Sequence, residues 1–199
     1  TLGFEINEEI RKKYLYNCRL IVTPTTGLTH IKFKKKTDIR ILYLHNFKKK
    51  IKSISSTAEH TINLILLSLR NTVSAINHTL EDNWNRSLFF GNDFENKTLG
   101  LIGYGRIGKR VSQIAQAFNA KIIKCDIKSN NYENELQKVL KKSDIISLHI
   151  HAHHNDNFIN ISKLKKMKKN CILINTSRGE IINEKDLIYS LKKKIISFA

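Results

Sequence analysis

A glycine-rich segment from Gly103 to Gly108 carries the clearest chemical signal in the sequence. Its residues, Gly-Tyr-Gly-Arg-Ile-Gly, fit the pattern G-x-G-x-x-G, follow the apolar run 99–102 and open a helical pattern. In this context the backbone N–H groups at a helix N-terminus can bind the pyrophosphate of a dinucleotide. We assign the tight turn to Gly103, the close approach of backbone to pyrophosphate to Gly105, and close packing of helix on strand to Gly108.

An acidic residue, Asp126, ends the strand predicted to follow this helix. Its carboxylate can accept hydrogen bonds from the hydroxyls of the adenosine ribose, and it repels a 2′-phosphate. The next residue is Ile127 rather than an arginine, so the sequence predicts NAD in preference to NADP. Lys124 and Lys128 are the nearby positive charges that would favour NADP instead.

A second group of residues, 175–183, places Arg178 in a turn of small residues after another predicted strand. The carboxyl ends of parallel strands form the edge at which open α/β sheets bind ligands. A guanidinium at that edge can bind a carboxylate through two hydrogen bonds and polarise an adjacent carbonyl. An arginine there can equally bridge a helix C-terminus or a surface acid, so this motif alone leaves both interpretations open.

Histidine and cysteine residues offer two further candidate sites. The segment His149–His154 is rich in histidine, and alternate residues of a strand share a face. Solvent-facing histidines often cluster by chance, so we predict no metal site. The three cysteines, Cys18, Cys125 and Cys171, are widely spaced and odd in number, which predicts free thiols in a reducing cytoplasm.

Hydrophobic periodicity predicts the elements that position these residues. The first 56 residues are expected to form short units: helices at 7–16 and 30–36, and strands at 19–23 and 40–45, with a shaped turn at Pro24–Gly27. One long helix then begins at Ser56 or Thr57, with Thr57 as N-cap, and continues through Ile76. A polar connector follows, with Trp84 as a packing anchor. Beyond it we expect strands at 98–103, 121–126, 144–150 and 171–175, helices at 106–118, 133–140, 162–167 and 184–193, and a further strand from Ile195.

Near-continuous apolar strands that alternate with helices are typical of a parallel sheet covered on both faces. The sequence therefore predicts an α/β fold with a doubly wound parallel sheet over residues 57–199. Residues 1–56 are predicted to be part of a second domain. The composition, 41% hydrophobic and 26% charged, is ordinary for a globular protein.

The excess of positive charge raises the question of nucleic-acid binding. Lys+Arg total 35 against 17 Asp+Glu, a formal net charge of +18, which would favour nucleic-acid binding. The lysine clusters, however, are spread along the chain without interleaved aromatics, and lysine far outnumbers arginine. We interpret them as a solvated surface and expect no nucleic-acid partner. The longest apolar run, 62–69, is far shorter than the ~18 residues of a membrane span, so no membrane partner is expected either.

Four stretches in this order resemble the D-isomer-specific 2-hydroxyacid dehydrogenase family, and its phosphoglycerate dehydrogenase branch most closely. They are residues 24–31, 56–61, 103–108 with Asp126, and 175–183. The resemblance implies a Rossmann-type NAD-binding domain at 57–199, preceded at 1–56 by part of a flavodoxin-like substrate domain. It also implies NAD-dependent hydride transfer between a D-2-hydroxy acid and a 2-oxo acid.

The resemblance assigns roles to individual residues. Thr26 and Gly27 lie in the loop whose backbone amides face the substrate carboxylate, and Thr26 is also near the nicotinamide. Arg106 and Ile107 contact the pyrophosphate, while Thr176 and Ser177 line the nicotinamide pocket. Arg178 matches the catalytic arginine, which holds the substrate carboxylate and C2 oxygen beside the nicotinamide. Candidate substrates are 3-phosphoglycerate, hydroxypyruvate and glyoxylate, and the expected assembly is a cytoplasmic homodimer.

The sequence departs from the family pattern after Ile195. The family then has an Asp, a Glu and a His that acts as general acid/base, and none of the eight histidines here occupies that position. We therefore expect a fragment, truncated at both ends, that binds the cofactor without turning over substrate. A non-catalytic NAD(H)-sensing module, similar to corepressors that resemble this family, is the alternative, and a basic nucleic-acid-binding protein is a weaker third.

Overall fold

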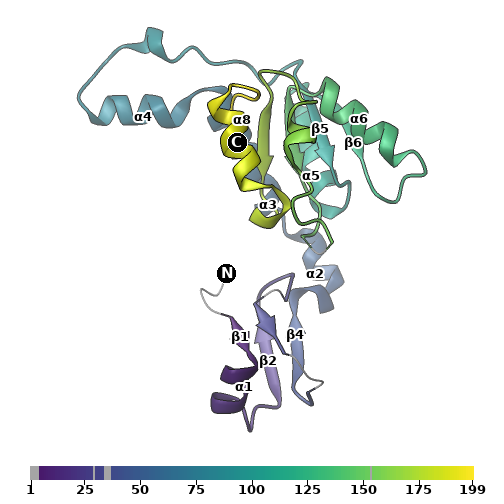
Figure 1. Ribbon diagram of the computed structural model, residues 1–199. Helices are drawn as coiled ribbons and strands as arrows, with labels where there is room; N and C mark the ends of the chain where they lie inside the picture. The colour runs from purple at the N-terminus through teal and green to yellow at the C-terminus, as the bar shows by residue number, and fades with distance from the viewer. Residues whose placement is uncertain (1–4, 29, 34–36, 153) are drawn as a thin grey trace. The chain divides into compact units, whose positions relative to one another are not determined.

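The computed structural model describes residues 5–28, 30–33, 37–152 and 154–199 (Figure 1). The chain divides into two compact units, Thr1–Ile54 and Ser55–Ala199. This division falls two residues before the boundary expected from the sequence at 56/57. The two units are described separately below.

The first unit is built from two short pairs of parallel strands. β1 (Ile6–Asn7) pairs with β3 (Ile31–Lys32), and β2 (Leu20–Thr23) pairs with β4 (Arg40–Tyr43). The helical elements are α1 (Glu8–Tyr14), η1 (Leu44–Asn46) and α2 (Lys48–Ser53). The helix predicted at 30–36 is wrong where the structure describes that segment, because Ile31 pairs with Ile6 in a strand. Residues 34–36 lie outside the described residues.

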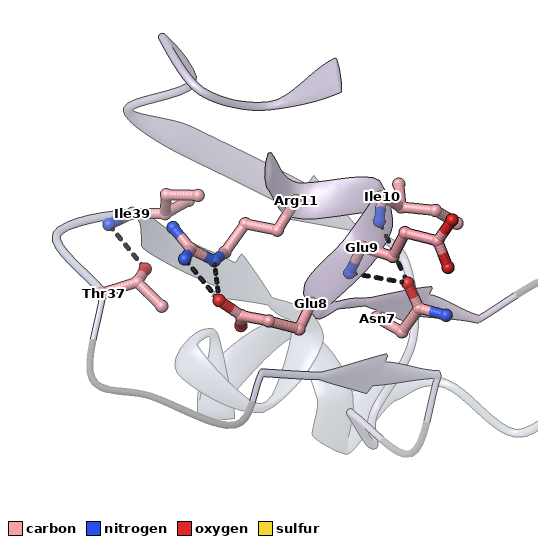
Figure 2. A network of polar contacts seen from close by, with 7 residues as sticks. All are labelled: Asn7, Glu8, Glu9, Ile10, Arg11, Thr37 and Ile39. Atoms are coloured by element: carbon pink, nitrogen blue, oxygen red, sulfur yellow. Dashed lines mark hydrogen bonds and ion pairs between the residues drawn. The ribbon is translucent and has the colours of Figure 1, made fainter. Parts of the chain in front are cut away.

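Figure 2 shows how local hydrogen bonds begin α1. The side-chain Oδ1 of Asn7 accepts from the N–H groups of Glu9 at 3.1 Å and Ile10 at 3.0 Å, which satisfies two otherwise unpaired donors. The guanidinium of Arg11 forms an ion pair with Glu8 one turn earlier. This short helix therefore depends on its cap and this ion pair, since none of its residues is buried.

The second unit contains a four-stranded parallel sheet in the order β6-β5-β7-β8. Its strands are β5 (Thr98–Ile102), β6 (Lys121–Cys125), β7 (Ile145–Leu148) and β8 (Ile172–Asn175). The connecting elements are α5 (Arg106–Ala117), α6 (Tyr132–Lys142), α7 (Ile161–Leu164), η3 (Gly179–Ile181) and α8 (Glu184–Lys192). The predicted doubly wound α/β fold is confirmed. In place of the strand expected from Ile195, the structure has a single parallel bridge between Phe198 and Ile172.

Two hydrophobic cores cover the two faces of this sheet. On one face, Ile65 of α3 (Ser56–Leu69) and Val111 of α5 pack in one cluster with strand residues such as Leu101. On the other, Leu140 of α6 and Leu164 of α7 belong to a second cluster. The strands are buried on both sides, which explains why they are nearly continuous apolar runs.

The long helix predicted from residue 56 is interrupted. α3 ends at Leu69 and α4 spans Thr72–Leu80, because Asn71 between them adopts a left-handed conformation with φ 51°. Asparagine tolerates this conformation better than most residues, while apolar residues continue at helical spacing on both sides of it. Thr57 is also not the N-cap: α3 begins at Ser56, after Ser55, whose hydroxyl donates to the Glu59 carboxylate.

α4 and the segment that follows it project from the rest of the second unit (Figure 1). α4 has no buried residue, and 3-10 helix η2 (Arg86–Leu88) lies in the following segment. The prediction that Trp84 is a packing anchor within the chain is wrong, since its side chain is 86% exposed. This projecting arm, residues 72–90, therefore has apolar side chains that its own chain does not cover.

Part of the lysine-rich charge lies at helix C-termini, although residues 48–50, all lysines, form the first turn of α2. α6 has Glu133 and Glu135 in its first turn and Lys141 and Lys142 in its last, so each charge opposes the helix dipole nearby. Lysines also lie in the last turns of α1 and α8. No described helix is long and apolar enough to cross a membrane.

Candidate functional site

The glycine-rich turn between β5 and α5 uses its three glycines in three different ways. Gly103 has φ +94°, and a Cβ there would meet the carbonyl oxygen of His149 at 2.6 Å. A Cβ on Gly108 would meet the carbonyl oxygen of Gly103 at 2.3 Å. A Cβ on Gly105, the residue before α5, would meet nothing within 4 Å. Open space at the N-terminus of α5 is what an approaching pyrophosphate needs, so this turn fits a dinucleotide.

Asp126, just after β6, binds the same turn. Its carboxylate accepts from the N–H of Tyr104 at 2.7 Å and from the N–H of Lys128 at 3.1 Å. The hydrogen bond from Lys128, with that from Tyr104, holds the pKa of Asp126 below its ordinary value despite partial burial. Each carboxylate oxygen keeps a further lone pair, so the ionised group can still accept from ribose hydroxyls.

Lys124 and Lys128, which would favour NADP, occupy different positions near Asp126. The Nζ of Lys124 lies 3.9 Å from the centre of the Tyr104 ring in a cation–π contact. Lys128 is exposed, and its backbone N–H is the group bonded to Asp126. Lys124 is therefore held against the glycine-rich turn.

The loop after β8 is held by hydrogen bonds among its own residues and by one to the end of β7. Asn175 accepts from the N–H of Ser177 at 3.0 Å and donates to the carbonyl oxygen of Arg178 at 2.8 Å. The Ser177 hydroxyl donates to the carbonyl oxygen of Leu148, the last residue of β7, at 2.8 Å. The guanidinium of Arg178 is exposed and donates to the carbonyl oxygen of Ser177 at 2.9 Å. A fixed backbone thus carries a charged group that can reach a ligand.

Thr176 in this loop is joined to α3 by a residue that the sequence did not single out. Its hydroxyl oxygen lies 2.9 Å from that of Thr61, which is fully buried and itself donates to the carbonyl oxygen of Thr57 at 2.8 Å. The sequence signal was a polar residue on the apolar face of a predicted helix. Such a residue needs a partner when it is buried.

His149 lies directly under the glycine-rich turn. Its Nε2 is 3.0 Å from the hydroxyl of the buried Ser147, and burial lowers the pKa of His149 to about 4. The imidazole is therefore neutral near pH 7 and serves as packing for the turn. In the described residues no group of three His, Cys, Asp or Glu side chains could hold a metal ion, and His153 lies outside those residues.

The candidate site residues of the second unit converge on one edge of its sheet. Gly103, Asp126 and Thr176 each follow the carboxyl end of a strand, and neighbouring strands are parallel (Figure 1). Arg106 and Ile107 form the first turn of α5 at the same edge. A cavity of about 400 Å³ lies elsewhere, lined by residues such as Phe94 and Asn119 that precede strands β5 and β6.

Thr26 and Gly27 belong to the first unit, in the loop after β2. The Thr25 hydroxyl donates to the carbonyl oxygen of Gly27 at 2.7 Å, and the N–H of Leu44 donates to the carbonyl oxygen of Thr25 at 3.0 Å. These bonds give the loop its shape.

Comparison with known proteins gives a consistent set of relatives. Residues 62–199 match the family model of the D-isomer specific 2-hydroxyacid dehydrogenase NAD-binding domain. The chain is 32% identical to glycerate dehydrogenase of Methylorubrum extorquens, over 94% of this chain and 61% of that protein. It is 30% identical to glyoxylate reductase of Korarchaeum cryptofilum, over 91% of this chain and 58% of that protein.

Solved structures agree with this likeness. A structure of D-lactate dehydrogenase from Aquifex aeolicus, complexed with NAD and lactic acid, superposes with a TM-score of 0.78 at 29% identity. The match covers 97% of this chain and 60% of that one. The chain thus spans about three fifths of the length of the relatives it matches.

Proposed function

Because the chain belongs to the D-isomer-specific 2-hydroxyacid dehydrogenase family, with the family's NAD-binding domain at 62–199, we propose that it serves NAD-dependent interconversion of a D-2-hydroxy acid and a 2-oxo acid. The observation that carries the proposal is the convergence of the glycine-rich turn, Asp126 and Arg178 on one sheet edge. The relatives named above are two dehydrogenases and a reductase, which favours an enzyme over a non-catalytic NAD(H) sensor.

The cofactor would be held by groups at the strand ends. The N–H groups at Gly105, Arg106 and Ile107 would bind the pyrophosphate, and Asp126 the adenosine ribose. Thr176 and Ser177 would line the pocket for the nicotinamide. NAD supplies the hydride acceptor or donor, and the protein orients it and excludes water.

The substrate carboxylate and C2 oxygen would be held by Arg178. A guanidinium binds a carboxylate through two parallel hydrogen bonds, which fixes both the position and the orientation of the acid. The resemblance to the family also assigns the backbone amides at Thr26 and Gly27 to the carboxylate, and Thr26 to the nicotinamide. In this proposal residues 1–56 are part of the substrate domain, and residues 57–199 are the NAD-binding domain. Glyoxylate, hydroxypyruvate and 3-phosphoglycerate with its 2-oxo form are the substrates to test first.

The proposed assembly is a cytoplasmic homodimer. The free thiols of Cys18, Cys125 and Cys171 support a reducing compartment. The projecting arm supports self-association, because six of its large apolar side chains are between 51% and 86% exposed: Val73, Ile76, Leu80, Trp84, Leu88 and Phe90. Exposed apolar surface of this extent is typical of an interface.

Binding measurements test the proposal without requiring turnover. We expect calorimetry to show NADH binding with a Kd in the micromolar range or tighter, and oxamate, an unreactive analogue of a 2-oxo acid, to bind the NADH complex. Arg178→Gln should weaken oxamate binding at least about tenfold, which corresponds to loss of a charge-assisted hydrogen-bond pair, and weaken NADH binding much less.

Arg110→Gln is the matched control, because Arg110 is an exposed arginine of α5 whose guanidinium bonds to Gln113 on the same helix. It should change neither affinity. Folded protein that binds no NADH would overturn the proposal, and oxamate binding that is indifferent to Arg178→Gln would overturn the assigned role of this arginine.

A further inference from the structure

The hydroxyl pair formed by Thr61 and Thr176 joins the buried face of α3 to the loop proposed to line the nicotinamide pocket. The two oxygens are 2.9 Å apart, a normal hydrogen-bond length. Thr61 is fully buried, whereas Thr176 is partly exposed at the sheet edge. One partner therefore belongs to the core and the other to the site.

The direction of this hydrogen bond follows from counting protons. Each hydroxyl has one proton to donate and two lone pairs. The Thr61 proton is used, because its oxygen lies 2.8 Å from the carbonyl oxygen of Thr57, which can only accept. The contact between the two threonines by itself allows either hydroxyl to be the donor. With the Thr61 proton directed at Thr57, the donor in that contact is Thr176. Thr176 then has no proton left for a ligand, and its remaining lone pair makes it an acceptor.

We propose that Thr61 is a positioning residue that makes the Thr176 hydroxyl an obligatory acceptor for the amide N–H of the nicotinamide carboxamide. This inference rests on the proposed function, in which Thr176 lines the nicotinamide pocket. The carboxamide has an NH₂ donor at one end and a carbonyl acceptor at the other. A freely rotating hydroxyl would pair with either end, whereas one oriented by Thr61 pairs only with the NH₂. Thr61 thereby selects one orientation of the carboxamide.

A cofactor analogue separates this role from general support of the fold. In the reduced 3-acetylpyridine analogue of NADH, an acetyl group replaces the carboxamide, so the donor is lost and the carbonyl acceptor stays. We expect the wild-type chain to bind NADH about three- to tenfold more tightly than this analogue, the range of one net hydrogen bond. The measured quantity is the ratio of the two dissociation constants from calorimetry.

Substitutions at Thr61 should change this ratio in a defined way. Thr61→Val keeps the shape but removes the acceptor, so the Thr176 proton becomes free to donate to the acetyl carbonyl and the ratio should fall to about one. Thr61→Ser keeps the hydroxyl and should keep the wild-type ratio. Thr61→Ala gives the same test as Thr61→Val if the valine variant does not fold.

Ser68 provides a matched control on the same helix. Its hydroxyl also donates to the carbonyl oxygen four residues earlier, Leu64, at 2.8 Å. Ser68→Ala removes that bond far from the sheet edge, so it should leave the ratio unchanged.

The possible results distinguish this inference from the proposed function. If Thr61→Val and Thr61→Ala weaken NADH and the analogue by the same factor, Thr61 has only a structural role and the inference is wrong. A wild-type ratio near one also rejects it, because the carboxamide NH₂ then makes no such bond. Failure of the wild-type chain to bind either ligand would instead reject the proposed function on which it rests.

Discussion

The glycines of the cofactor turn act through different atoms, so substitutions there separate ligand binding from stability. A Cβ on Gly105 would meet no atom of the protein within 4 Å. We expect Gly105→Val to change the free energy of unfolding by less than about 1 kcal/mol, because no packed atom is displaced. It should abolish NADH binding, because the side chain fills the space required by the pyrophosphate.

Gly108→Ala serves as the contrast, since its Cβ would lie 2.3 Å from the carbonyl oxygen of Gly103. Relieving that overlap should cost about 2 kcal/mol of stability as well as affinity. Urea denaturation and NADH titration of both variants measure the two effects. Equal loss of stability in both would contradict these assignments.

His149 predicts a pH dependence of folding stability. Burial lowers its pKa from 6.5 to about 4, so between these values the unfolded chain binds the proton more strongly than the folded chain does. Its contribution is thus fully present above pH 6.5 and is lost as the pH falls towards 4, by up to about 3 kcal/mol. Urea denaturation at pH 7.0 and pH 4.5 should show this loss.

The variant His149→Asn should show a smaller loss over the same range, because it cannot take up the proton. His60→Asn, at an exposed position of α3, is the control and should follow the wild-type profile. A profile for His149→Asn identical to that of the wild type would exclude His149 as the source.

At the scale of elements, the arm formed by α4 and the segment to Phe90 leaves large apolar side chains exposed. We expect the 23.1 kDa chain to sediment as a dimer, because the arm's apolar side chains need a partner surface. Leu80→Asp combined with Trp84→Ala should convert it to a monomer.

Tyr16→Asp changes a side chain that is 75% exposed in the first unit and should leave the mass unchanged. Sedimentation equilibrium measures all three proteins. A wild-type monomer at concentrations of about 100 μM would contradict the proposed use of the arm.

The arm also shows where sequence periodicity misled the assignment of elements. Apolar residues at helical spacing continue from Ile62 to Ile76, and this spacing alone predicts one helix. The break arises at Asn71, whose left-handed backbone is a local choice that periodicity does not encode. The same limitation explains the segment at 30–36, since a two-residue strand such as β3 is defined by its pairing with distant Ile6.

For the whole molecule, we expect the 199-residue chain to bind NADH without oxidising it when hydroxypyruvate or glyoxylate is added. All eight histidines precede Arg178, whereas the family's general acid/base follows it, so the proton needed at the C2 oxygen has no assigned donor. Absorbance at 340 nm follows the reaction, with commercial D-lactate dehydrogenase and pyruvate as positive control. Robust NADH oxidation would show that another group supplies the proton.

Much of the second unit was predictable because its signals are local. The glycine pattern, the acid at the end of the next strand and the alternation of apolar strands with helices all follow from neighbouring residues, and they determine the parallel sheet and the edge at which Asp126 and Arg178 lie. The prediction of NAD from Asp126 rests on a local signal of the same kind. These signals lie in neighbouring residues, whereas the strand order itself is set by long-range pairing, such as that of Leu99 with Ile145.

Tertiary structure alone decided the features that join distant residues. The sequence shows that Thr61 and Thr176 are polar, but only packing of α3 against the end of β8 brings their hydroxyls to 2.9 Å and so sets the direction of the proton. Burial beneath the glycine-rich turn likewise makes His149 neutral, where the sequence alone showed only a cluster of histidines. In both cases the chemistry depends on which groups are desolvated together, and that is a property of the folded chain.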